Sequence, residues 1–382
     1  MKTLYTPEKL EHDRYMISVF RQKQALPYEQ KVLHAKKRAW EFYEELGGNV
    51  HVSVGGLDSI TLTLFLRSIG IECPAVSVSC LEDKSLQKIH KELGIIPLKP
   101  LKSKVEVIKE FGYPILSKET ANKIHLLQNP TEKNKTVRHA IITGETGEYG
   151  GNRTGSRMKM SDKWLQKFGG ADPEGAALGY QAAPFKVSDK CCYYLKEKPC
   201  DNYAKENGSS PYLGLMASEH GRREKVLMTT GCNYYGKDHK RSAPFAIFSR
   251  NDLLRLAIDL NVPVPEIYGE IKKDQNGNLI TTGAQRTGCS MCGFGIHLEK
   301  RPHRFDMLRA RNEKEWRFWM YDMGWGDVLT YCGIGWEDKV DVFEQCTMFC
   351  DGCPNCTGGN ESDENSCMPV QRRCGMPGGG KG

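Results

Sequence analysis

The fold is decided by the stretch Val50-His51-Val52-Ser53-Val54-Gly55-Gly56-Leu57-Asp58-Ser59. Valines at every second position predict a β-strand, the glycine pair breaks it, and Asp58-Ser59 opens an apolar helix over 60–66. Glycines let a backbone approach a phosphate closely, and N–H groups at a helix N-terminus attract its negative charge. We therefore expect Gly55, Gly56 and the Ser59 hydroxyl to contact a phosphate, and Asp58 to cap the helix or position a metal ion.

The same alternation continues along the chain. Strands are predicted over 75–79 and 212–216, and helices over 84–93 and 251–260. Strands that alternate with helices favour an α/β fold with a doubly wound, mostly parallel sheet. Residues 145–180 are rich in glycine and polar groups, which indicates a long insertion or loop.

Composition divides the chain into four parts. We predict an N-terminal helical segment (1–48), a nucleotide-binding domain (49–310), a small tryptophan-rich helical subdomain (311–345) and a flexible cysteine-rich tail (346–382). The net charge of +7 suits a phosphate-bearing ligand and leaves nucleic acid possible without requiring it. The chain has neither a signal-peptide pattern nor a long apolar run, so we expect a cytoplasmic protein without a membrane span.

The cysteines indicate a second site. The chain has 15 of them, and without a secretory signal, metal or redox chemistry is favoured over disulfides. The pair Cys191-Cys192 and the CxxC of Cys289 and Cys292 together supply four thiolates, the complement of a [4Fe–4S] cluster. A four-cysteine zinc site is the alternative, although adjacent cysteines are awkward in a tetrahedral knuckle.

These motifs carry a family resemblance. The stretch 53–59 resembles the S-G-G-x-D-S loop of the adenine nucleotide α-hydrolases, also called the PP-loop, with Val54 in place of the first serine and Ser53 beside it. The CC…CxxC order, with Lys196 four positions after Cys192, is similar to that of the adenylyl-sulfate (APS) reductases. The resemblance covers about residues 49–300 and implies an ATP-pyrophosphatase-like fold, an adenosine nucleotide, and a cluster on the four cysteines.

A third stretch, 214–223, resembles the family's G-[IL]-R-A-x-E-S-x-x-R motif. Glu219 and Arg223 match its glutamate and last arginine, while Met216 and His220 replace its first arginine and its serine. The resemblance implies that Glu219 and Lys196 contact the nucleotide and that Arg223, together with Lys196, neutralises the sulfonate, since a guanidinium suits sulfate or phosphate.

The reductases' E-C-G-[LI]-H nucleophile motif is absent. The tail carries Cys353 and Cys356 as Cys-Pro-Asn-Cys, which can act as a nucleophile and redox pair or bind metal with Cys346 and Cys350. The leading hypothesis is an enzyme that reduces APS or 3′-phosphoadenylyl sulfate (PAPS) to sulfite, with a thioredoxin-like reductant. The alternatives are an ATP pyrophosphatase that uses Mg²⁺ and a cysteine desulfurase to thiolate tRNA or the DNA backbone, and an inactive nucleotide-binding module.

Overall fold

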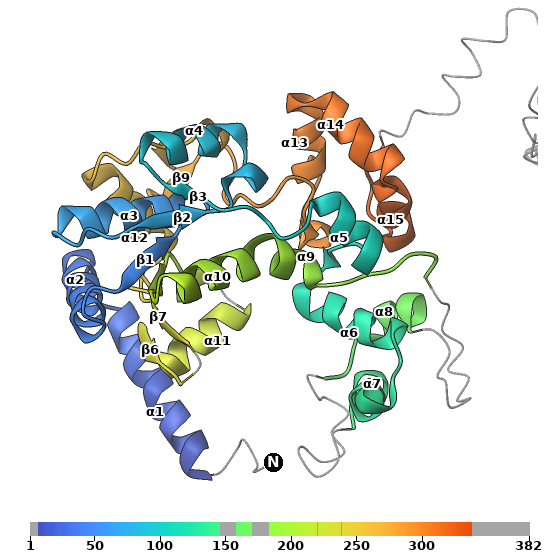
Figure 1. The fold of residues 1–382 in the computed structure, drawn as a ribbon, viewed down its shortest axis with the longest axis horizontal. Coiled ribbons are helices and arrows are strands. Elements are labelled where there is room, and N and C mark those ends of the chain that lie inside the picture. Colours follow the sequence, from blue (N-terminus) through green and yellow to red (C-terminus); the bar gives the residue numbers. More distant parts are fainter. Residues whose placement is uncertain (1–6, 146–157, 170–182, 220, 238, 338–382) are drawn as a thin grey trace, which may run out of the picture. The chain divides into compact units, whose positions relative to one another are not determined.

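A computed structural model describes residues 7–145, 158–169, 183–219, 221–237 and 239–337 (Figure 1). The chain divides into two compact units, 1–334 and 335–382, and the description below concerns the first. The boundaries that the sequence predicts at 48, 310 and 345 stay predictions.

The first unit is built on a six-stranded sheet that is parallel except at one edge. Its spatial order is β3 (Ile96–Pro97), β2 (Ala75–Ser77), β1 (Val50–Ser53), β5 (Ser210–Leu213), β7 (Lys240–Ser242) and β6 (Asn233–Tyr235). Only β6 runs antiparallel to its neighbour. The predicted mixed α/β fold with a mostly parallel central sheet is therefore confirmed.

Two small sheets accompany the large one. The parallel pair consists of β4 (Ile115–Leu116) and β10 (Gly293–Phe294), and the antiparallel hairpin of β8 (Ile271–Lys273) and β9 (Leu279–Thr281). The hairpin packs against α12 (Arg250–Asp259), whose Asn251 side chain accepts a hydrogen bond from the Leu279 amide at 2.8 Å.

Helices make up most of the remaining described structure. The N-terminal region forms α1 (Pro7–Gln24) and α2 (Tyr28–Glu45). The helices between the strands are α3 (Leu57–Ser68), α4 (Lys84–Glu92), α5 (Lys104–Phe111), α6 (Lys118–Gln128), α7 (Lys135–Thr143), α8 (Asp162–Phe168), α9 (Lys190–Cys192), α10 (Lys198–Glu206) and α11 (Gly221–Thr230). After α12 follow α13 (Arg304–Arg311), α14 (Glu313–Arg317) and α15 (Trp325–Cys332). None of the helices in the described part of the chain is long and apolar enough to cross a membrane.

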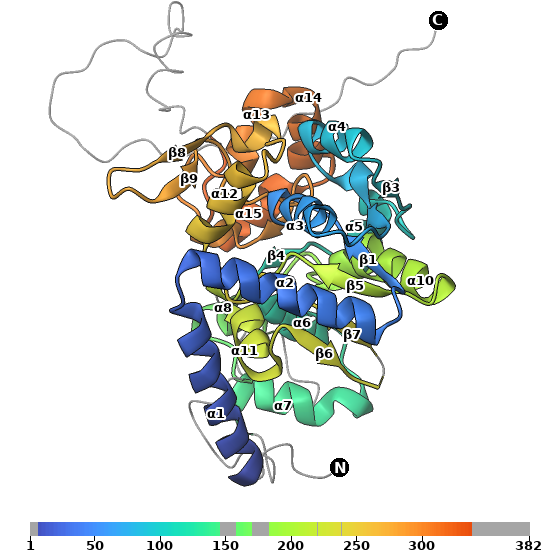
Figure 2. The same ribbon diagram turned by 90° about the vertical axis from the view of Figure 1, so that its left-hand side faces the viewer.

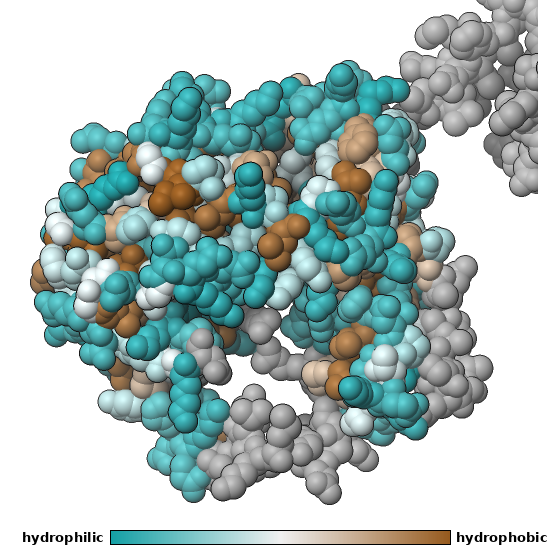
Figure 3. All heavy atoms as spheres, in the orientation of Figure 1, coloured by the Kyte–Doolittle hydropathy of each residue, from teal (hydrophilic) through white to brown (hydrophobic). Residues whose placement is uncertain are grey.

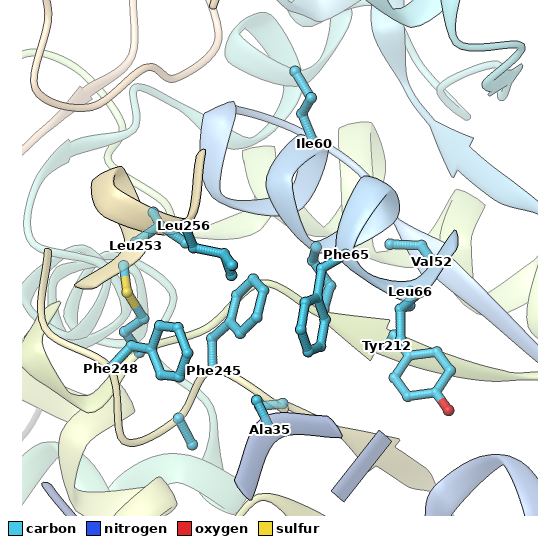
Figure 4. Packing of buried hydrophobic residues seen from close by; sticks show 14 of the residues in the cluster. Ala35, Val52, Ile60, Phe65, Leu66, Tyr212, Phe245, Phe248, Leu253 and Leu256 are labelled. Atoms are coloured by element: carbon cyan, nitrogen blue, oxygen red, sulfur yellow. The ribbon is translucent and has the colours of Figure 1, made fainter. Parts of the chain in front are cut away.

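The core lies between one face of the sheet and the helices α2, α3 and α12, which Figures 1 and 2 show next to one another. Val52 and Tyr212 point into it from β1 and β5, and the Tyr212 hydroxyl donates to the Ala39 carbonyl of α2 at 2.6 Å. Phe65 of α3 packs against Phe245 with ring centroids 5.2 Å apart (Figure 4).

The opposite face of the sheet meets α10. His51 alternates with the valines of β1 and so points away from α2. Its ring lies edge-on to Tyr203 of α10, and its Nδ1 is 2.8 Å from the Ser209 hydroxyl. Helices thus cover both faces. On the exterior face shown in Figure 3, hydrophilic side chains predominate and apolar ones are scattered among them.

One sequence expectation changes in detail. The strand predicted over 212–216 ends at Leu213, because Gly214 turns the chain toward the start of α3. A Cβ on Gly214 would lie 2.9 Å from the Ser59 amide nitrogen, so only glycine allows this approach. In the tryptophan-rich region, Trp316, Trp319 and Trp325 are buried, while Trp336 is half-buried.

Candidate functional site

The candidate site lies where β1, β2 and β5 end. The chain passes from β1 to β2 on one side, while β5 lies on the other side of β1, so the carboxyl end of β1 is a topological switch point. Ligands of open α/β sheets bind in this position. The segments that follow the three strands are 54–56, 78–81 and 214–219.

The glycine turn presents the start of α3 at this position. Gly56 is the N-cap residue of α3 and provides no side-chain cap. The Gly55 amide donates to the Ser59 hydroxyl at 2.8 Å, and that hydroxyl donates to the Gly56 carbonyl at 2.9 Å. Ser59 therefore supports the turn from within, and its hydroxyl must reorient to contact a phosphate. Ser53 ends β1, paired in register with Val76 and Leu213.

Tyr268 holds the turn from outside. Its buried hydroxyl accepts a hydrogen bond from the Leu57 amide at 3.1 Å and lies 2.7 Å from the Thr287 hydroxyl. A Cβ on Gly56 would stand 2.4 Å from this Tyr268 oxygen and 2.9 Å from the Thr287 oxygen. Gly56 is thus required for the close approach of Tyr268 to the turn, whereas a Cβ on Gly55 would meet only Glu82, at 3.9 Å.

His90 fixes the other side of the turn. Its Nε2 lies 2.9 Å from the Gly55 carbonyl, which can only accept, so Nε2 carries the proton. Its Nδ1 then accepts from the Ser79 hydroxyl at 2.9 Å. Burial lowers the pKa of His90, which keeps the ring neutral in this role.

A small pocket opens beside the turn. It is lined by Asp58, Met216, Ser218, Glu219, Arg250, Gln285 and Arg286. Arg250 forms an ion pair with Asp58, and Glu219 is paired with Arg223 at 2.6 Å and lies 3.9 Å from Arg286. Three guanidinium groups therefore surround two carboxylates, which leaves a net positive charge for an anionic ligand.

From the sequence we predicted roles for Asp58, Glu219 and Arg223, all of which lie at or beside this pocket. The sequence did not indicate a role for Arg250 or Arg286. Met216, which replaces the family's first arginine, is buried and gives the pocket an apolar wall. Arg250 and Arg286 come from the start of α12 and from the segment before Cys289, far from Met216 in the chain. In the sequence, each of these two residues could be noticed only as an arginine that stands beside a recognisable motif.

The two carboxylates influence each other. Burial and the nearby charge of Glu219 raise the pKa of Asp58, and the attraction of Arg250 only partly offsets them. A pair of carboxylates beside a phosphate site is how proteins hold Mg²⁺, which takes one or two carboxylates together with ligand phosphates. The pocket therefore offers arginines that suit an anion and carboxylates that suit a cation.

The adjacent cysteines lie on a helical run interrupted by a π-helical turn. Cys191 and Cys192 end α9, the π-helical turn spans Tyr193–Glu197, and α10 continues from Lys198. Such turns are frequent at functional sites, because the wider coil changes the direction of its side chains. Lys196 lies on this turn.

The CxxC segment carries its own irregularity. Met291, between Cys289 and Cys292, has a φ of 52°, in the left-handed region that a non-glycine residue rarely adopts. Its side chain is buried, which holds the strained turn in place. The Ser290 hydroxyl donates to Glu315 of α14 and thereby fastens the segment to the helices beyond it.

The fold brings the four predicted cysteines together. The charges of Cys192, Cys289 and Cys292 act on Cys191, and burial together with these neighbours raises the pKa of Cys191 to about 12. Burial also raises the pKa values of Cys192 and Cys289. Neutral thiols in this environment become thiolate ligands only when a metal compensates their charge.

Three lysines face these thiols. Lys118 is hydrogen-bonded to Cys192 and paired with Glu197 at 2.9 Å. Lys196 contacts both Cys289 and the Glu82 carboxylate. Lys104 is buried beneath them, and its ammonium finds no hydrogen-bond partner among the described residues. Cationic groups around four cysteines suit an anionic thiolate-bound cluster.

Within the described ranges, no three His, Cys, Asp or Glu side chains are arranged to hold one metal ion. The donor set at this position is four thiols with lysines beside them, which is the chemistry of a thiolate-bound cluster, and four thiolates also suit zinc. Cys353 and Cys356 lie outside the described residues.

Comparisons with known proteins add little to this description. No family model matches the chain, and no curated protein matches it. One solved structure, the PAPS reductase from Candida auris in a phosphate complex, is similar to it with a TM-score of 0.31 and 10% identity, over 69% of this chain and 96% of that one.

Proposed function

We propose that this chain is an adenosine-nucleotide-dependent enzyme of sulfur metabolism, with a nucleotide phosphate at the Gly55-Gly56 turn and a [4Fe–4S] cluster on the four cysteines beside it. Lys196 provides the main support. Its ammonium contacts the Glu82 carboxylate, which borders Gly55, and also the thiol of Cys289. One side chain thus contacts both sites. Such a contact would allow a cluster to influence a bound nucleotide.

The leading reaction is reduction of APS or PAPS. Arg223, Arg250 and Arg286 supply the positive charge that a sulfonated nucleotide needs. A thiolate of Cys353 or Cys356 attacks the sulfonate sulfur, the sulfur–oxygen bond to the nucleotide phosphate breaks, and the nucleotide leaves with the electron pair. A thioredoxin-like dithiol then displaces sulfite from the resulting thiosulfonate. The dithiol is oxidised to a disulfide and supplies the two electrons.

A second reaction is favoured by the presence of both Asp58 and Glu219 in the lining of one pocket. Two carboxylates in the pocket suit Mg²⁺ bound to ATP. In this reaction, ATP adenylates an oxygen of an acceptor such as tRNA or DNA and releases pyrophosphate. A cysteine desulfurase supplies a persulfide whose terminal sulfur displaces AMP. A dithiol then cleaves the sulfur–sulfur bond of the adduct, leaves the sulfur on the acceptor and is itself oxidised to a disulfide.

One set of assays separates these reactions. The protein is purified anaerobically, analysed for iron, zinc and sulfide, and then incubated either with APS or PAPS and a dithiol reductant or with Mg·ATP. Sulfite release selects the reductase, and pyrophosphate release selects the ATP-dependent enzyme. Binding of a nucleotide without turnover identifies an inactive module. A protein that binds none of the three nucleotides contradicts the proposal.

A further inference from the structure

Lys104 occupies a position that the apoprotein does not explain. It is the first residue of α5, where the partial positive charge of the helix N-terminus disfavours a cation. Its residue exposure is only 9%, and its ammonium is without a hydrogen-bond partner in the described part of the chain. A buried, unpaired ammonium costs several kcal/mol unless an opposite charge compensates it.

The neighbours of Lys104 form one side of the four-cysteine site. Helix α5 packs on α9 through Val107, one turn along the same face, which contacts Cys191 and Leu195 (Figure 1). The Lys104 ammonium lies 5.0 Å from the centre of the Trp319 ring, a cation–π contact. Burial lowers the pKa of Lys104, and negative charge on the nearby Cys191, Cys289 and Cys292 opposes this shift.

Among the described residues, this ammonium has no hydrogen-bonded carboxylate partner. The charge of Glu315 acts on Lys104, but the Glu315 oxygens are hydrogen-bonded to the Ser290 hydroxyl and to the Asn312 amide, the latter at 3.0 Å. Lys118 and Lys196, the other lysines at the thiols, have carboxylate partners in Glu197 and Glu82. Lys104 therefore differs from both in facing the thiols without a carboxylate partner.

We propose that Lys104 is the buried counter-cation of a [4Fe–4S] cluster held by Cys191, Cys192, Cys289 and Cys292, and that its charge stabilises the reduced form of that cluster. Four thiolates around the cluster core carry a net negative charge, and each added electron increases it. A fixed positive charge in a low-dielectric environment favours the more negative form. This inference rests on the cluster of the proposed function but not on the reaction that the enzyme catalyses.

The test compares Lys104→Met with Lys109→Met. Lys109 lies on the same helix and is exposed, so it controls for the loss of one lysine from α5. Each protein is reconstituted anaerobically, its iron and sulfide are counted, and the cluster is titrated reductively with detection by electron paramagnetic resonance. We expect a more negative midpoint potential for Lys104→Met and an unchanged one for Lys109→Met. Equal potentials in all three proteins would overturn the inference.

Thermal unfolding gives a second, independent readout. In the iron-free protein, Lys104→Met removes an uncompensated buried charge, so its Tm should equal or exceed that of the wild type. Loading with the cluster should raise the Tm of Lys104→Met less than that of the wild type. The same gain in both proteins would contradict a counter-cation.

Lys104→Arg covers the case in which Lys104→Met holds no iron. If Lys104→Arg then retains the cluster, the result supports a requirement for positive charge at this position. If both variants lose the cluster, the shape of the lysine side chain is what matters, and the inference is overturned. A wild-type protein that binds no iron would instead refute the cluster itself, together with the proposed function. The two failures are therefore distinguishable.

Discussion

The hydroxyl groups of Tyr268 and Thr287 lie 2.7 Å apart, and this contact joins the two halves of the candidate site. Tyr268 also accepts a hydrogen bond from the Leu57 amide at the glycine turn, while Thr287 stands two residues before Cys289 in the CxxC segment. One buried phenol thus contacts both the glycine turn and the segment that leads to Cys289. Lys196 makes a second connection from Glu82 to Cys289.

Tyr268→Phe should weaken the turn, because it leaves the Leu57 amide without its acceptor. Loss of a buried hydrogen bond of this kind lowers the free energy of unfolding by about 1–3 kcal/mol. We expect that loss by denaturant titration, together with weaker nucleotide binding by calorimetry. Tyr15→Phe, at a side chain that is 65% exposed, is the control and should match the wild type. Unchanged stability of Tyr268→Phe would show that the phenol does not support the turn.

Alanine at Gly56 and alanine at Gly55 should behave differently, although the residues are adjacent. The Cβ at position 56 meets the Tyr268 oxygen at 2.4 Å, whereas at position 55 its contact at 3.9 Å is ordinary. Overpacking costs about 1–3 kcal/mol, so Gly56→Ala should lower the Tm while Gly55→Ala keeps it. Circular dichroism melts of the two variants decide this, and equal Tm values would contradict the packing described here.

Asp58→Asn should stabilise the unliganded protein near neutral pH. Burial and Glu219 raise the pKa of Asp58 in the folded state, so the folded protein favours the protonated acid. The protonated Asp58 contributes its full stabilisation below the pKa that this group has in the unfolded chain. That contribution is lost as the pH rises through the pKa that it has in the folded protein. The Tm difference between Asp58→Asn and the wild type should therefore shrink as pH falls. A difference independent of pH would argue against a raised pKa.

In the ATP-dependent reaction, the same Asp58→Asn variant should lose Mg²⁺-dependent ATP binding, because it removes one of the two carboxylates in the pocket. Calorimetry with and without Mg²⁺ measures this effect. Retained Mg²⁺-dependent binding would place the cation elsewhere.

Lys31→Met should destabilise the fold without touching the site. The Lys31 ammonium lies 2.8 Å from the Asp252 carboxylate in a buried pair that joins α2 to α12. Removal of one partner from such a pair costs about 3 kcal/mol. Burial acts to raise the pKa of Asp252. The hydrogen bonds from Lys31 and Ser249 outweigh this effect and hold the pKa below its usual value. The stability that the pair provides is therefore present above the unfolded pKa and is lost as pH falls through the folded one.

Denaturant titrations across acidic pH should thus show the Lys31→Met deficit at neutral pH and its decline in acid. Iron content and nucleotide affinity of the folded variant should remain those of the wild type. A deficit that grows in acid would contradict this account of the pair.

Serine substitutions of the cysteines should divide into two groups. Replacement of Cys191, Cys192, Cys289 or Cys292 should remove iron from the purified protein, because thiolates are the ligands of the proposed cluster. Cys80→Ser and Cys200→Ser are matched controls, since both residues are free thiols in the same unit, and they should retain full iron. Iron retained after loss of two of the four cysteines would refute the assignment.

The sequence predicted the parts of this structure that depend on local pattern. The alternating valines of β1, the glycine turn and the apolar start of α3 are fixed by neighbouring residues, because side-chain period and turn chemistry act within a few positions. The strand at 212–216 was too long, since the approach of Gly214 to Ser59 is a contact between segments distant in the chain.

By itself, the sequence determined that this chain has an α/β sheet, a glycine turn suited to phosphate and two pairs of cysteines. Only the tertiary structure decided that Tyr268 and Thr287 hold the turn, that Arg250 and Arg286 line one pocket with Met216, and that Lys104 is buried beside the thiols. The physical reason is that charge compensation and close packing depend on distances across the fold, whereas propensity and periodicity act along the chain.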